Sequence, residues 1–166
     1  MKTFFKATMI VVFLLLCSNG IQAQTPQTKL NQVELMKQGI GYWKCESKDT
    51  TFVIEDKYYG GGHEVYIKSE TKGKIIWEGK TLVGYDKKND ILIESVIIHN
   101  SPDIALYLMR FISANKFEEM SLENISNPEQ ATEKWTYEFK SPNLLIATHI
   151  LNNKLVYVRN YSRVKQ

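Results

Sequence analysis

The sequence predicts an all-β protein, namely one closed antiparallel up-and-down barrel of about 8–10 strands preceded by one short helix. Three observations support this prediction. Apolar side chains alternate with polar ones along much of the chain, which is typical of strands with one buried face. Turn residues separate these segments at short intervals, so each strand can pair with the next. The chain also leaves no room for the crossover helices that a parallel sheet needs.

The composition fits one globular domain. The chain has 166 residues, 21 Lys and Arg against 18 Asp and Glu, and 43% hydrophobic side chains. A normal apolar content with a small net charge argues against disorder. The same composition excludes collagen-like, coiled-coil and disulfide-scaffold proteins. We therefore expect a single packed core.

Residues 1–23 have the features of a secretory signal peptide. Lys2 and Lys6 precede an apolar run over residues 9–16, and Ala23 supplies a small residue at the cleavage point. The run is too short to cross a membrane, which takes about 20 apolar residues. The sequence thus predicts export to the periplasm or the extracellular space.

Removal of the signal peptide changes the charge and the cysteine count. Residues 24–166, the expected single barrel domain, keep 19 Lys and Arg against 18 Asp and Glu. This balance argues against a nucleic-acid partner. Cys45 becomes the only cysteine, so no internal disulfide is expected, and no remaining apolar stretch has the length of a transmembrane segment. Acylation at Cys17 is a competing interpretation, disfavoured because the bulky Leu16 precedes it.

One short helix is expected before the strands. Apolar residues recur at helical spacing over residues 29–38, after a polar linker at 24–28. Gly39 and Gly41 then end the helical segment.

The strands follow from residue 40 onward. Alternation is clearest where Trp135, Tyr137 and Phe139 are separated by polar residues. Asn152-Asn153 joins two apolar runs directly, which predicts a tight two-residue hairpin, and residues 123–133 read as a loop. The other strands are expected at 40–47, 51–58, 63–70, 74–86, 90–99, 104–112, 116–122, 143–151 and 154–163.

A glycine and a tryptophan mark the expected first strand. The segment Gly41-Tyr42-Trp43 follows the short helix. It resembles the Gly-x-Trp signature of lipocalins, in which the helix closes one end of the barrel and the Trp packs beneath it. The resemblance implies that an Arg late in the last strand lies over the Trp43 ring, a role for Arg159 or Arg163. The chain departs from that family because it lacks a Thr-Asp-Tyr-like second motif and a long helix after the last strand.

Further glycine motifs follow in order. Gly61-Gly62, Gly79 and Gly84-Tyr85-Asp86 stand after the Gly-x-Trp segment. This order is similar to that of a group of secreted, calycin-like proteins whose domain has no assigned function. The resemblance covers roughly residues 30–100 and implies a barrel with no inherited reaction.

Aromatic and polar residues on the strands are candidates for lining a cavity. Glu94 lies in a segment that is apolar on both faces. If its face is interior, burial would raise the pKa of its carboxyl group and make it a ligand anchor, an acid or a base. The alternative is that Glu94 faces outward and another element covers its apolar neighbours. The candidate ligand-binding residues are Trp77, Glu94, Tyr107, Trp135, Tyr137 and His149.

These observations predict a binding protein for a small apolar or amphipathic molecule held inside the barrel. One alternative is a cavity enzyme, an isomerase or hydrolase using Glu94 with His99 or His149. Another is a filled barrel that serves as a protein-interaction module. The three histidines do not form a local zinc-binding set. An axial haem ligand at His149 is the weaker use of that side chain, because hydrogen-bonded structural histidines are far commoner. No cofactor, metal or catalytic residue is therefore assigned.

Overall fold

A computed structural model describes residues 29–165. The predicted signal peptide, Cys17 and the linker lie outside this range. The described part contains ten strands, in agreement with the prediction. They are β1 (Gly41–Ser47), β2 (Thr50–Tyr59), β3 (Gly62–Thr71), β4 (Lys74–Asp86), β5 (Ile91–Ile98), β6 (Ile104–Ser113), β7 (Lys116–Ser121), β8 (Glu133–Ser141), β9 (Leu144–Leu151) and β10 (Lys154–Val164).

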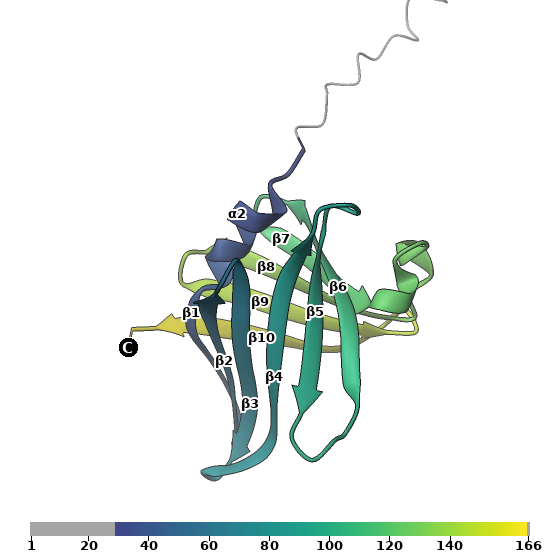
Figure 1. Cartoon of the computed structure of the whole chain (residues 1–166). Helices are drawn as coiled ribbons and strands as arrows, with labels where there is room; N and C mark the ends of the chain where they lie inside the picture. Colours follow the sequence, from purple (N-terminus) through teal and green to yellow (C-terminus); the bar gives the residue numbers. More distant parts are fainter. Residues whose placement is uncertain (1–28, 166) are drawn as a thin grey trace, which may run out of the picture.

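The strands form one closed antiparallel barrel. Each strand pairs with the next along the chain, and β10 pairs with β1 to close the sheet. The predicted all-β, up-and-down barrel is therefore confirmed. Figure 1 shows β2 to β5 standing upright in front, with β7 to β10 crossing behind them at a steep angle. The two walls of the closed, twisted sheet thus face each other across the interior of the barrel.

The short helix covers one end of the barrel (Figure 1). It consists of α2 (Gln32–Met36) and a following turn of 3₁₀ helix (Lys37–Gly39). The helix begins three residues later than predicted because the Asn31 side chain caps it, accepting a hydrogen bond from the Glu34 backbone N–H. No helix among residues 29–165 is long and apolar enough to cross a membrane.

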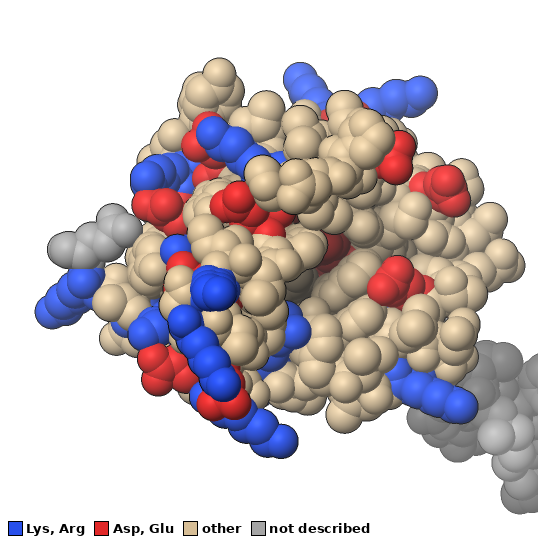
Figure 2. Space-filling model, turned by 90° about the horizontal axis from the view of Figure 1, so that it is seen from below, with Lys and Arg blue, Asp and Glu red and all other residues tan. Residues whose placement is uncertain are grey.

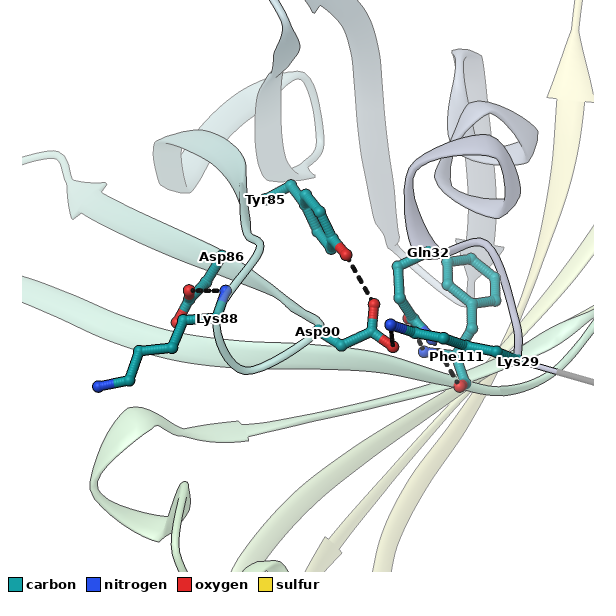
Figure 3. Close-up of polar contacts among 7 residues, drawn as sticks. All are labelled: Lys29, Gln32, Tyr85, Asp86, Lys88, Asp90 and Phe111. Carbon is teal, nitrogen blue, oxygen red and sulfur yellow. Dashed lines mark hydrogen bonds and ion pairs between the residues drawn. The ribbon is translucent and has the colours of Figure 1, made fainter. Parts of the chain in front are cut away.

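A buried glutamine fastens α2 to the barrel wall (Figure 3). Gln32 Nε2 donates to the Phe111 carbonyl at 3.2 Å, and the Phe111 backbone N–H donates to Gln32 Oε1 at 2.7 Å. The amide group of Gln32 thus forms the same pair of hydrogen bonds with the Phe111 backbone that a neighbouring strand would form. An ion pair between Lys29 and Asp90, with 3.2 Å between Nζ and Oδ2, makes a second contact at this end.

The Gly84-Tyr85-Asp86 motif shapes the turn between β4 and β5 (Figure 3). The Tyr85 hydroxyl donates to Asp90 Oδ1 at 2.7 Å across the turn. Asp86 accepts hydrogen bonds from the Lys88 backbone N–H and from the Asn89 side chain. Both motif side chains therefore serve the turn beside α2.

Trp43 forms the floor beneath the helix. Its side chain is fully buried, and Nε1 donates to the Gly39 carbonyl at 2.6 Å. The Arg163 guanidinium lies over the indole, with Cζ 4.2 Å from the ring centroid, and donates to the Gln38 and Pro142 carbonyls. Of the two arginines expected for this role, Arg163 covers Trp43, whereas Arg159 lies over Phe52. β10 pairs with β1 in a register that places Arg163 opposite Trp43.

The last hairpin and the long loop follow the prediction with one addition. Asn152 and Asn153 have φ values of 51° and 61°, as a tight two-residue turn between strands requires. The loop contains two 3₁₀ turns, at Leu122–Asn124 and Pro128–Gln130. Residues Leu122 and Ala131 pack on a second apolar cluster outside β5 and β6, made by Ile91, Leu108 and Met120. This cover explains why β5 is apolar on both faces.

Candidate functional site

A cavity of about 450 Å³ occupies the interior of the barrel. Its size falls within the range of roughly 300–1,000 Å³ that is usual for small-molecule sites. Figure 2 views the end opposite α2 and shows a central hollow, with acidic atoms visible in its depth. The barrel is therefore hollow rather than filled. The lining is mainly apolar, and many of its side chains are aromatic: Trp43, Phe52, Trp77, Tyr107, Phe111, Phe117, Trp135, Tyr137, Phe139, Tyr157 and Tyr161.

Five of the six candidate ligand-binding residues line this cavity, as their strand faces suggest. Trp77 is 39% exposed, so it lies where the cavity meets solvent. The Tyr107 and Trp135 rings meet edge to face with centroids 5.7 Å apart. Tyr137 stacks on Phe117, with centroids 4.6 Å apart. The structure thus brings these side chains from four different strands to one space.

His149 is the sixth candidate, and it lies beside the cavity without lining it. Its ring stacks flat on Trp135, with centroids 4.6 Å apart. Its Nε2 contacts Glu133 Oε1 at 2.8 Å. His149 therefore packs beside Trp135 on the neighbouring strand, and its Nε2 atom already has a carboxylate partner.

Glu94 points into the barrel. It lines the cavity, is only 9% exposed, and lies directly opposite Tyr107 on β6. Burial raises the pKa of Glu94 to about 7. Glu94 Oε2 and the nearby Thr81 Oγ1 are both buried, and among the described residues their only polar contact is with each other, which acts against the rise in the pKa of Glu94. Buried oxygens with so few partners are costly and are commonly found where a ligand or water binds.

A second interior carboxyl group was missed by the sequence analysis. Glu119 on β7 lines the same cavity and lies opposite Met109 and Trp135. Burial raises the pKa of Glu119 well above its ordinary value, and the neighbouring Glu94 adds to the rise. The sequence could have indicated this, because Glu119 lies two residues after Phe117 and therefore shares the same face of β7.

A buried contact between an aspartate and a histidine was also missed. Asp56 and His63 are 7% and 4% exposed, with 2.8 Å between Asp56 Oδ1 and His63 Nδ1. Burial raises the pKa of Asp56, although His63 acts against the rise. Asp56 also lines the cavity near α2. Asp56 and His63 each share a strand face with apolar residues, and this pattern could have indicated that both side chains are buried.

The histidines do not meet Glu94. Each of the three contacts a different carboxylate: His63 with Asp56, His99 with Glu78, and His149 with Glu133. His99 lies outside the barrel, where its side chain is 63% exposed. The pairing that the enzyme alternative requires is therefore not seen in the structure. Residues 29–165 also contain no group of three or more His, Cys, Asp or Glu side chains placed to hold a metal ion.

Arg159 is one of two cations that line the cavity, the other being Lys68. Its guanidinium carbon lies 3.6 Å from the Phe52 ring centroid and 3.8 Å from that of Tyr157. The planar group is thus held between two aromatic rings, an arrangement that favours guanidinium over ammonium.

No protein-family model matches this sequence, and no curated protein is significantly similar to it.

Proposed function

We propose that this protein is an exported, calycin-like barrel that binds a small apolar or amphipathic molecule inside its cavity. The observation that carries the proposal is the hollow of about 450 Å³ with a mainly apolar lining that is rich in aromatic side chains. Burial of ligand surface against these rings supplies the binding free energy, at roughly 25 cal/mol per Å² of apolar area. Export rests on the predicted signal peptide at residues 1–23.

Few polar groups interrupt this lining, and they are well placed to orient a ligand. Glu94 and Glu119 face the cavity from β5 and β7, while Arg159 faces it from β10. Sites of this kind combine an apolar body with a small number of convergent polar groups. The arrangement supports binding of a ligand in one orientation.

A fluorescent apolar probe tests the proposal. N-phenyl-1-naphthylamine is expected to bind the protein with an increase in its emission, and to quench the tryptophans because all three line the cavity. Two variants should block binding from opposite walls, Ala147→Phe on β9 and Ser69→Phe on β3. Each is expected to weaken probe affinity by about tenfold or more, since the added ring occupies ligand space.

Thr148→Phe is the matched control for these variants. It adds the same ring one residue along β9, where alternation points the side chain outward. Circular dichroism checks that each variant folds. Equal probe affinity in the wild type, the blocking variants and the control would place the probe outside the barrel and contradict the proposal.

A further inference from the structure

Some charged side chains of the cavity have a partner of opposite charge within the protein, and others do not. Asp56 is paired with His63, and Lys68 with Glu70 at 2.6 Å. Burial raises the pKa of both Glu94 and Glu119, which favours their uncharged forms. Arg159 is different, because a guanidinium remains charged at any physiological pH. None of the ion pairs within residues 29–165 involves it.

Arg159 lines the cavity, and two aromatic rings pack against its guanidinium group. Phe52 and Tyr157 cover the two faces of the guanidinium. The N–H groups lie in the plane of the guanidinium, so stacking on its faces does not use them. Tyr161 is the neighbouring polar side chain on β10; burial raises its pKa to about 12, and Arg159 opposes that rise. One hydroxyl cannot satisfy five donors.

We propose that the ligand bound in the barrel carries an anionic oxygen group, a carboxylate or sulfonate, and that the edge of the Arg159 guanidinium binds it. This inference rests on the proposed function and names the chemical class of its ligand. An Arg fork matches two oxygens of such a group at once, and the pair is strengthened where water is excluded. The apolar body of the ligand then lies against the indoles of Trp77 and Trp135.

The Arg159 side chain is preorganised for this role in the ligand-free protein. A free arginine loses considerable side-chain freedom when it binds, whereas one already stacked between two rings loses less. The rings also hold the charge inside an apolar wall without an acidic partner that a ligand would have to displace. The site therefore selects for anions over neutral molecules of equal shape.

Two probes that differ by one sulfonate test the inference. 1-Anilinonaphthalene-8-sulfonate carries the charge, and N-phenyl-1-naphthylamine has the same ring system without it. The wild-type protein is expected to bind the sulfonate more tightly. Arg159→Gln should weaken sulfonate binding by about 10- to 100-fold, the usual range for a lost hydrogen bond to a charged group, while leaving the neutral probe within about threefold.

Matched variants distinguish the effect of the positive charge of Arg159 from that of its planar guanidinium geometry. Arg159→Lys keeps the charge and loses the planar fork, so intermediate sulfonate affinity is expected. Lys154→Gln removes an exposed cation from the same strand and should change neither affinity. Wild-type protein that prefers the neutral probe, or Arg159→Gln protein that binds the sulfonate unchanged, would overturn the inference and leave the proposed function standing. Failure of both probes to bind would overturn both proposals.

Discussion

Replacement of Trp43 by alanine is expected to lower the free energy of unfolding by about 4 kcal/mol, the middle of the range for loss of a large buried aromatic side chain. The indole is fully buried between α2 and the barrel. The substitution also removes the hydrogen bond to the Gly39 carbonyl and the ring beneath the Arg163 guanidinium. Urea unfolding followed by far-ultraviolet circular dichroism measures the change without depending on tryptophan emission.

Trp77→Ala is the control for the Trp43 substitution. Trp77 is 39% exposed at the open end of the cavity, so its removal leaves no enclosed void. We expect it to cost less than about 1 kcal/mol, in the range of surface substitutions. If both variants lose the same stability, Trp43 is not the structural floor of the barrel.

The free energy of unfolding is expected to fall by about 3 kcal/mol between pH 5 and pH 8 because of Glu94. Burial raises the pKa of this carboxyl group in the folded protein from an ordinary 4.5 to about 7, and each tenfold change in proton affinity corresponds to about 1.4 kcal/mol. Between pH 4.5 and pH 7 the unfolded chain has largely lost the Glu94 proton, whereas the folded chain largely retains it. Stability is therefore greatest below pH 4.5 for this group and declines as the pH rises through 7.

Glu94→Gln isolates that contribution. Glutamine has a similar shape and does not titrate, so the variant should lose about 3 kcal/mol less stability than the wild type over the same pH range. Burial also raises the pKa values of Asp56 and Glu119, which leaves a residual decline in the variant. Urea unfolding at pH 5 and pH 8 gives both numbers. Identical pH dependence in wild type and variant would show that Glu94 is ionised and solvated in the folded protein.

The strands of this fold could be predicted from local sequence because their signals are local. Alternation identifies each strand, and turn residues such as Asn152-Asn153 end it within two positions. Sequential pairing then fixes the topology, since each strand needs only its neighbour along the chain. The predicted helix differs from α2 mainly at its start, where the Asn31 cap sets the boundary.

The contacts across the barrel were harder to predict because they depend on register between distant strands. Arg159 and Arg163 lie four residues apart on one face of β10, and only the pairing of β10 with β1 decides which covers Trp43. The orientation of Glu94 depended in the same way on a remote element. The loop after β7 covers the outer face of β5, so apolar residues on both faces could not show which side was interior. The void itself depends on how all ten strands close.

Native mass spectrometry of the protein isolated from the cells that produce it can show whether the barrel holds a small molecule. We expect an additional mass of a few hundred daltons that is lost on denaturation, and a shift to the mass of the probe complex when N-phenyl-1-naphthylamine is added. A spectrum that shows only the bare chain, both before and after addition of the probe, would contradict the claim that this barrel holds a small molecule.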